Sequence, residues 1–221
     1  MITNFDQNNQ SVLGVENSVK RNTWKFRLDD ERVALSLSQR LGVPEMIGRI
    51  IASRNISMDE VHDFLNPKLR NLLPDPCLLK DMEKATNRIV DAILNKEKIA
   101  VFGDYDVDGA TSSALLVRYF RSLNIEIMTY IPDRLKEGYG PTKNSINKLH
   151  NLGSNVLITV DCGTTSFEPI EQANHLGIDL IVLDHHKSDI NLPLAYAIVN
   201  PNRIDDENNN LNLTSLAAVG V

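Results

Sequence analysis

The sequence has few cysteines and no long apolar run. Its 221 residues include two cysteines, Cys77 and Cys162, which argues against a disulfide framework and leaves no cysteine pair with metal-ligand spacing. No apolar stretch approaches the roughly 18 residues that a membrane-spanning helix requires. The first 20 residues are polar and lack the apolar stretch of a secretory signal. We therefore expect a cytoplasmic protein with no membrane segment.

Two common phosphate-binding motifs are also missing. Neither the GxxxxGK phosphate loop nor the GxGxxG dinucleotide fingerprint occurs, so nucleotide binding of those types is excluded. The segment 104–109 reads DYDVDG and has the D-x-D-x-D-G spacing of a calcium loop. However, position 12 of such a loop would be Leu115 and not glutamate, and a strand pattern precedes it, so we reject this interpretation. Taken alone, the segment is also compatible with a plain acidic turn.

The acidic charge is concentrated in the second part of the chain. Residues 1–97 contain 14 Lys+Arg and 14 Asp+Glu, a net charge of zero, whereas residues 98–221 contain 9 and 15, a net charge of −6. Five of these carboxylates lie at or just after the end of an apolar run: Asp104, Asp106, Asp108, Asp161 and Asp184. This placement favours a cluster that binds cations. Because bound cations invert the local charge, the acidic composition does not exclude nucleic acid as a partner.

The apolar pattern divides the chain into three parts. Residues 1–20 are polar and predict a flexible arm. Residues 21–97 predict helices, since Val33, Leu37 and Leu41 recur at helical spacing and the stretch 82–93 is strongly amphipathic. Ser57 and Glu60 have the spacing of a capping box at the start of another helix. Residues 98–221 form the third part.

Strand and helix patterns alternate in residues 98–221. Helical patterns occupy 110–123, 141–152 and 165–177, and short runs rich in Ile and Val occupy 98–103, 125–131, 155–160, 177–183 and 196–200. Nearly continuous apolar strands separated by helices predict an α/β fold, a five-stranded parallel sheet with helices on both faces. Ligands of such sheets bind at the carboxyl ends of the strands. The unusual polar residues follow those ends.

The Asp184-His185-His186 sequence decides between an acidic turn and a metal site. Two adjacent histidines follow an aspartate at the end of an apolar run, and Asp161 ends another run. Imidazole and carboxylate together suit Mn²⁺, Zn²⁺ or Fe²⁺. With the DYDVDG aspartates, ligands from three strand ends can hold two ions roughly 4 Å apart.

These motifs resemble those of a known superfamily. The segments GDYDVDGATSSALL, IPDRLKEGYGPT, ITVDCGTTS, VLDHHKS and NPNR, in this order, are similar to the motifs of the DHH phosphoesterases, and EGYG and the LLPDPCLLKDMEKA lead-in are similar to its RecJ exonuclease branch. The resemblance covers about residues 20–221. It implies a metal-dependent 5′→3′ exonuclease acting on single-stranded DNA in recombination and repair, with single-strand-binding protein as a candidate partner. We expect a monomer.

The resemblance also assigns roles to individual residues. Asp104, Asp106, Asp161 and His185 would hold two Mn²⁺ or Mg²⁺ ions, with Asp161 as the bridging ligand. Asp108, Asp184 and His186 would support the site. Arg134 and Arg203 would bind phosphate oxygens. Tyr139 would stack on a base or serve packing, and Thr111 and Ser112 would bind phosphate at a helix start or simply cap it.

Two departures from the family pattern matter. Some superfamily members place a metal-binding histidine where this chain has Phe102. RecJ-like proteins are also far longer and supply a further aspartate ligand and further domains downstream, so the sequence resembles an N-terminal fragment. We expect the 221 residues alone to fold but to be a poor nuclease, and the terminal LAAVGV to leave apolar surface exposed. One alternative is an oligoribonuclease or another small-substrate phosphoesterase of the same core, such as a cyclic-dinucleotide hydrolase or a pyrophosphatase. The other is a non-catalytic DNA-binding scaffold.

Overall fold

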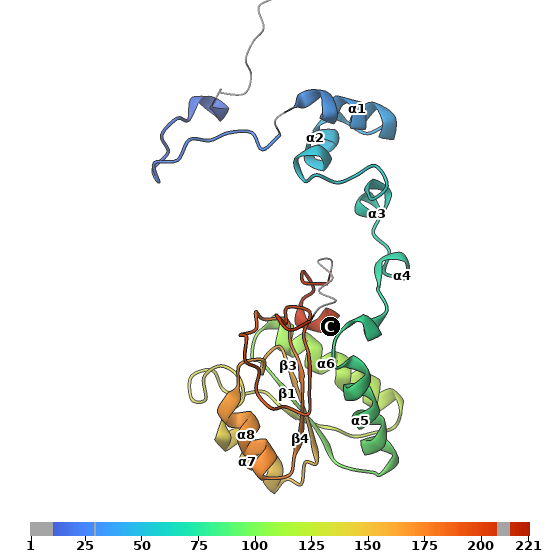
Figure 1. The fold of residues 1–221 in the computed structure, drawn as a ribbon, viewed down its shortest axis with the longest axis vertical. Helices are drawn as coiled ribbons and strands as arrows, with labels where there is room; N and C mark the ends of the chain where they lie inside the picture. Colours follow the sequence, from blue (N-terminus) through green and yellow to red (C-terminus); the bar gives the residue numbers. More distant parts are fainter. Residues whose placement is uncertain (1–10, 29, 207–212) are drawn as a thin grey trace, which may run out of the picture. The chain divides into compact units, whose positions relative to one another are not determined.

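The computed structural model describes residues 11–28, 30–206 and 213–221, which form two compact units, Met1–Leu73 and Pro74–Val221 (Figure 1). The first half of the predicted N-terminal arm, residues 1–10, lies outside the described residues. Among the described residues no helix has both the length and the apolar composition needed to cross a bilayer.

The first unit is helical, as predicted. It contains a 3-10 turn, η2 (Val12–Gly14), and helices α1 (Glu31–Leu41), α2 (Glu45–Ser53), α3 (Val61–Leu65) and α4 (Leu69–Leu72). The Asp30 side chain caps α1 and Gly42 ends it in the left-handed conformation. Ser57 and Glu60 make the reciprocal capping hydrogen bonds. The helix itself begins only at Val61, because a turn precedes it.

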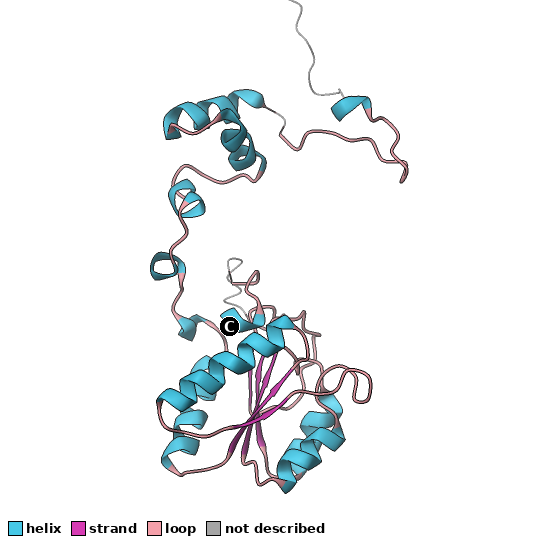
Figure 2. Cartoon of the chain, turned by 180° about the vertical axis from the view of Figure 1, so that it is seen from behind, coloured by secondary structure: helices cyan, strands magenta, loops and turns pink. Residues whose placement is uncertain are grey.

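The second unit contains the predicted five-stranded sheet. Its strands are β1 (Ile99–Gly103), β2 (Met128–Tyr130), β3 (Val156–Val160), β4 (Asp179–Leu183) and β5 (Ala197–Val199), all parallel, in the order β2-β1-β3-β4-β5. Helices α5 (Met82–Leu94) and α6 (Val107–Ser122) cover one face, and α7 (Lys143–Asn151) and α8 (Phe167–His175) cover the other (Figure 2). Alternate residues of the buried strands enter the two cores, as Val101 and Phe102 do.

Helix α5 packs on the sheet, so the compact unit begins before the predicted domain boundary at 97/98. Ala85 and Ala92 are buried in the core that α5 shares with the sheet. The Arg88 guanidinium contacts Asp179 at the start of β4 and Glu97, both at 2.6 Å. The amphipathic pattern of α5 was evident in the sequence, but not which surface it packs against. The boundary between compact units lies at Leu73/Pro74.

Side chains occupy the outer edge of β5. The strand pairs with β4 alone. Asp81 Oδ2 accepts from Ile198 N–H at 3.1 Å, and Arg203 Nη1 donates to Ile198 O at 2.6 Å. Both backbone groups of Ile198 are therefore satisfied without another strand.

The last residues pack onto the core, contrary to the expectation of an exposed apolar end. Leu213 and Ala218 are buried, and Leu216 and Val221 pack against the core formed with α5 and α6. Val219 is the exposed apolar residue of this segment. The apolar residues of this terminal segment thus cover the core formed with α5 and α6.

Candidate metal centre

Two aspartates follow β1 at the start of α6. Asp104 comes directly after the strand, is 2% exposed, and has one oxygen, Oδ1, with no hydrogen-bond partner. Asp106 caps α6, because its Oδ1 accepts from the N–H groups of Asp108 and Gly109 at 2.9 and 3.1 Å. A Cβ on Gly109 would lie 2.3 Å from Asp104 O, so only glycine permits this close turn.

Asp161 follows β3, the neighbour of β1, in an unusual backbone conformation. Its φ is 61°, in the left-handed region that aspartate tolerates better than most residues. Its N–H donates to Leu183 O at 3.0 Å, and its side chain is buried. This turn places a carboxylate oxygen of Asp161 within 4.8 Å of oxygens of Asp104 and Asp106. Strained backbone of this kind concentrates at functional sites.

Asp184 organises the two histidines that follow β4. Its Oδ1 accepts from the backbone N–H groups of His185 and His186, at 2.7 and 3.2 Å, and from His186 Nδ1 at 2.7 Å. Its Oδ2 accepts from Thr164 N–H at 3.1 Å. With four donors around it, this buried carboxylate supports the histidines and has little capacity left for a ligand of its own.

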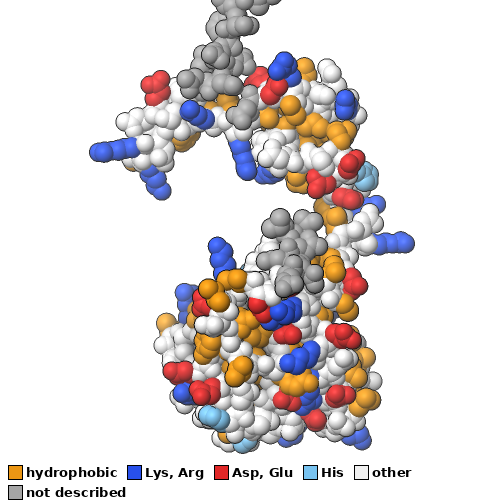
Figure 3. Space-filling model, viewed as in Figure 1, with side chains coloured by type: hydrophobic (Ala, Val, Ile, Leu, Met, Phe, Trp, Pro, Cys, Tyr) orange, Lys and Arg blue, Asp and Glu red, His pale blue; other side chains and the backbone are white. Residues whose placement is uncertain are grey.

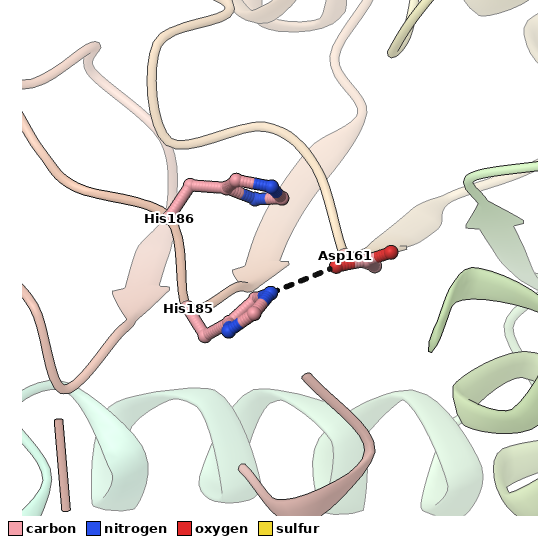
Figure 4. A group of neighbouring side chains, drawn as sticks. All are labelled: Asp161, His185 and His186. Atoms are coloured by element: carbon pink, nitrogen blue, oxygen red, sulfur yellow. Dashed lines mark ion pairs between the residues drawn. The ribbon is translucent and has the colours of Figure 1, made fainter. Parts of the chain in front are cut away.

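Both imidazole rings are held through Nδ1. His185 Nδ1 lies 3.0 Å from Leu216 O, and His186 Nδ1 bonds Asp184. A carbonyl or carboxylate at Nδ1 favours the tautomer with its proton there and leaves Nε2 as a ligand atom. His185 Nε2 lies 3.3 Å from Asp161 Oδ1 (Figure 4). Histidines that bind metals are oriented in this way.

The described residues form two ligand groups that share Asp161. One contains Asp104, Asp106 and Asp161, the other Asp161, His185 and His186, and ligand atoms within each group lie within 4.8 Å of one another. The buried atoms Asp104 Oδ1 and Asp161 Oδ1 accept no hydrogen bond, a costly state that a cation would relieve. The donor set therefore fits two divalent ions, with Asp161 in the shared position.

Burial and mutual repulsion perturb the carboxylates of the first group. Burial raises the pKa of Asp161 to about 7, and the hydrogen bond to Asp106 and the charge of Asp106 add to this. Burial also raises the pKa of Asp104. The pKa of Asp106 is lowered, chiefly by the hydrogen bond from Gly109 N–H. A buried carboxylate that ionises only near neutral pH is typical of a functional site, and a bound cation would favour its ionised form.

Hydrogen bonds reverse the effect of burial at Asp184 and His186. Burial opposes ionisation of Asp184, but the hydrogen bonds from Thr164 and His186 outweigh it and lower the pKa of Asp184. For His186, burial favours the neutral ring, but the hydrogen bond to Asp184 outweighs it and raises the pKa of the imidazole. The pair is stable as a carboxylate and a ring that donates from Nδ1.

Tyr139 and Arg134 lie in the loop after β2. The Tyr139 hydroxyl donates to Asp161 O at 3.2 Å and lies 3.3 Å from His186 Nδ1, so the ring borders the site while remaining half exposed. Arg134 is exposed, and its guanidinium lies 5.1 Å from the centre of the Tyr105 ring. Among the described residues Arg134 has no carboxylate partner; the neighbouring Glu137 bonds Tyr130 instead. Both positions are compatible with contact to a substrate.

The hydroxyls at the start of α6 bond within the helix. Thr111 Oγ1 donates to Val107 O at 2.7 Å, and Ser112 Oγ donates to Asp108 O at 2.6 Å. Ser112 is buried. Neither residue caps α6, since Asp106 is the cap, and their predicted contact with phosphate stays a prediction. Asp108 itself lies in the first turn of α6, beside the ligand group and outside it.

Arg203 does not face the metal centre, and this corrects its predicted role in phosphate binding. Its side chain is 6% exposed. Its Nε and Nη2 donate to the two Asp205 oxygens at 2.8 Å, and Nη1 donates to Asp81 at 2.7 Å. The two parallel N–H groups of a guanidinium can bond the oxygens of a carboxylate as well as those of a phosphate. The sequence could not reveal the partner, because Asp81 lies far away along the chain.

We expect Arg203→Ala to destabilise the second unit by roughly 3 kcal/mol or more, because it leaves Asp81 and Ile198 O without their donor. Urea unfolding followed by circular dichroism measures this. Arg203→Lys should recover part of the loss. An Arg203→Ala protein with unchanged stability and weakened DNA binding would restore the phosphate role.

Two asparagines after β5 support the histidines, and the sequence interpretation assigned them no role. Asn200 Nδ2 donates to His186 O and to Thr164 Oγ1, both at 2.8 Å. Asn202 Nδ2 donates to His185 O at 2.5 Å. Asn200 is completely buried. The NPNR motif was visible in the sequence, and a buried asparagine after a strand is the signal that could have identified this support.

Phe102 contributes to the core and not to the metal centre. It is completely buried, and its ring stacks on Tyr130 with centroids 5.5 Å apart. The position at which some superfamily members carry a histidine ligand thus supplies no ligand here. The two groups that share Asp161 hold all the candidate ligands among the described residues.

Residues 98–221, more than half of the chain, match the family described as DHH family, N-terminal domain. The chain belongs to the DHH family. Its family segment begins at the predicted position 98, whereas the compact unit begins earlier, at Pro74, because α5 packs on the sheet.

Similar DHH proteins are RecJ exonucleases. The chain is 35% identical over 179 residues to the single-stranded-DNA-specific exonuclease RecJ of Bacillus subtilis, covering 80% of this chain and 23% of that protein. It is 38% identical over 180 residues to the Escherichia coli RecJ, covering 81% and 30%. A crystal structure of Thermus thermophilus RecJ in complex with Mn²⁺ aligns with a TM-score of 0.64 and 26% identity, over 87% of this chain and 27% of that one. The chain therefore spans less than a third of these relatives.

Proposed function

We propose that this DHH chain carries the metal centre of a metal-dependent phosphodiesterase that degrades single-stranded DNA from its 5′ end. The observation that carries the proposal is the pair of ligand groups sharing Asp161, on a chain whose relatives are named single-stranded-DNA-specific exonucleases. Mn²⁺ or Mg²⁺ would be the ions. Participation in recombination and repair, single-strand-binding protein as a partner, a monomeric state and a cytoplasmic location remain predictions.

The residues divide the work of such a site. When bound, two divalent ions supply a nucleophilic water at neutral pH and neutralise charge on the phosphate. Asp104, Asp106 and Asp161 would hold ions from the β1 and β3 ends, and His185 from the β4 end. His186, for which the resemblance implied a supporting role, belongs to the same group of possible ligands as His185 and could also bind an ion. Asp184, Asn200 and Asn202 bond the two histidines and thereby keep their Nε2 atoms in place. No nucleophilic serine or cysteine is required.

A hydrolysis assay with Mn²⁺ and matched substrates tests this function. We expect Mn²⁺-dependent release of mononucleotides from the 5′ end of a single strand, above the background of an Asp104→Ala/Asp161→Ala protein. Elemental analysis of the purified chain should find the metal lost in that double variant. Faster hydrolysis of dinucleotides or pyrophosphate than of long strands would favour the small-substrate alternative. Metal binding by the longest available form of the protein, with no hydrolysis of any substrate, would favour a scaffold.

We expect Arg134 to contact phosphate and not bases. Its exposed guanidinium forms no ion pair with a described residue, and it lies near enough to Asp104 to oppose the rise in the pKa of that carboxyl. Arg134→Ala should weaken binding of all single-stranded sequences alike and reduce the slope of log affinity against log salt by about 0.7. Fluorescence anisotropy at several salt concentrations measures this. Lys143→Ala, at the start of α7, is the matched control, and an unchanged slope in Arg134→Ala would remove Arg134 from the phosphate-binding residues.

A further inference from the structure

A short stretch of the first unit combines cations with exposed aromatic rings. Residues 20–27 read KRNTWKFR and contain four basic residues, no acidic residue, and two aromatic ones, in a chain with a net charge of −6. We call residues 20–27 the cationic–aromatic segment. All eight of its residues are exposed. Figure 3 shows Lys and Arg side chains projecting from this arm, at the upper left of the view.

The two rings of the segment are not part of a core. Trp24 is 51% exposed and Phe26 is 64% exposed. The core of the first unit consists of residues from α1, α2 and α3 with their neighbours, and neither ring belongs to it. Large aromatic side chains that stay in water on a unit with its own core are available to a ligand.

The four cations of the segment are equally available. The residues are Lys20, Arg21, Lys25 and Arg27, and none of them forms an ion pair with a described residue. In contrast, Arg32 and Arg49 of the same unit are paired with Asp30, Glu31 and Glu45. The segment is therefore an uncompensated positive stretch.

Backbone hydrogen bonds give the segment a defined shape. Val12 N–H donates to Trp24 O at 2.8 Å, and Trp24 N–H donates to Val15 O at 3.0 Å, so the chain folds back on itself. Ser18 closes the tip: its N–H donates to Asn22 O at 3.0 Å, and its O accepts from Arg21 N–H at 2.7 Å. A strand binding here would meet side chains on a pre-formed loop.

We propose that the cationic–aromatic segment is a second binding site for single-stranded nucleic acid, separate from the metal centre. Cations neutralise successive phosphates, and aromatic rings between them stack on unpaired bases, which is how proteins hold single strands without reading their sequence. The bases of a duplex are paired and cannot stack on these rings, and an acidic protein or a lipid surface contains no bases. The aromatic rings therefore favour a single strand. The proposal extends the proposed function, because it concerns holding a strand and not cleaving it.

Trp24 makes the site directly observable, because it is the single tryptophan of the chain. The experiment titrates the 221-residue protein with oligothymidine in EDTA, where no metal-dependent cleavage occurs, and follows tryptophan fluorescence. We expect quenching that saturates, weakens with salt, and is much smaller with a DNA duplex, heparin or anionic vesicles. Fluorescence unchanged by oligothymidine, or quenched equally by duplex, heparin or vesicles, would overturn the proposal.

Matched variants locate the site. Lys25→Ala/Arg27→Ala should reduce the slope of log affinity against log salt by about 1.4, twice the value for one phosphate contact with a single strand. Lys68→Ala/Arg70→Ala removes the same charge from an exposed part of the same unit and should leave the slope unchanged. Trp24→Ala should weaken binding about tenfold, measured by anisotropy of labelled DNA, whereas Trp24→Phe keeps a stacking ring and should weaken it less.

Circular dichroism confirms that each variant folds, which is expected because the substituted side chains lie outside the core. An equal effect of the 68/70 control would show a general charge effect and overturn the site. The outcome is independent of the metal centre: an Asp161→Ala protein that keeps the quenching and loses hydrolysis supports both proposals. Quenching without hydrolysis by the longest available form of the unsubstituted protein would reject the nuclease function alone.

Discussion

Replacing Asp161 with alanine is expected to reduce single-strand hydrolysis by several orders of magnitude, more than any other single carboxylate change. Asp161 belongs to both ligand groups, so its loss removes a ligand from each ion position. The measurement is Mn²⁺-dependent release of nucleotides by the longest available form of the protein, with Asp108→Ala as the control outside the ligand groups. Activity within a few-fold of the unsubstituted protein would refute the shared-ligand assignment.

The same position should show opposite effects on stability with and without metal. The pKa of Asp161 in the folded protein, about 7, is above the value of 3.8 for an ordinary aspartate, so the metal-free folded state loses stability as pH rises between these values. Asp161→Asn removes that loss. In EDTA above pH 7 its melting temperature should therefore exceed that of the unsubstituted protein by about 5 °C, since 1 kcal/mol shifts a domain of this size by about 2–4 °C.

Near pH 4 the two melting temperatures in EDTA should converge, because both forms are then neutral at position 161. With Mn²⁺ at pH 8 the order should reverse, since only the unsubstituted protein gains the binding free energy of both ions. A variant that melts lower in EDTA at pH 8 would show that Asp161 has a stabilising partner in the metal-free protein.

Replacing Asp184 with alanine should have the largest effect on folding. The change leaves the N–H groups of Thr164, His185 and His186 without their acceptor in a buried position. Loss of a buried, fully hydrogen-bonded carboxylate costs about 3 kcal/mol or more. Urea unfolding of the second unit measures the loss, and Asp184→Asn, which keeps one acceptor oxygen, should lose less.

The pH dependence gives an independent test of Asp184. Because hydrogen bonds lower its pKa in the folded state, its contribution is fully present above pH 4 and disappears as pH falls below the ordinary aspartate value. The difference in unfolding free energy between Asp184→Asn and the unsubstituted protein should therefore shrink in acid. A difference that stays constant down to pH 2 would mean that the charge of Asp184 is not what stabilises the loop.

Most of the sheet unit was predictable because its signals are local. Each apolar run became a strand, and each carboxylate or histidine after a run lies at a strand end, where a parallel topology brings the ends together. The Asp161 turn and the role of Nδ1 in the histidines were not predictable. Both depend on backbone carbonyl oxygens, those of Leu183 and Leu216, that carry no sequence signature.

The failures of prediction share one physical cause, which is pairing over long sequence distance. Arginine is a common phosphate ligand, so the sequence suggested that role for Arg203. Only its bond to Asp81, which is distant in the sequence, shows that Arg203 stabilises the fold. The surface on which α5 packs could not be predicted for the same reason, since an amphipathic helix must pack on something, and only the structure shows that this helix packs on the sheet. Local pattern identifies a face or a charge but not its partner.

The occupied edge of β5 determines how this sheet can associate. A free strand edge is a template on which another chain can add a strand and begin polymerisation. At Ile198 an incoming strand would have to displace Asp81 and Arg203 from their backbone partners and leave a buried guanidinium without its carboxylate. The opposite edge, β2, offers only three residues, Met128–Tyr130. The ion pair that stabilises the fold thereby also covers the backbone groups to which a further strand would bond at Ile198.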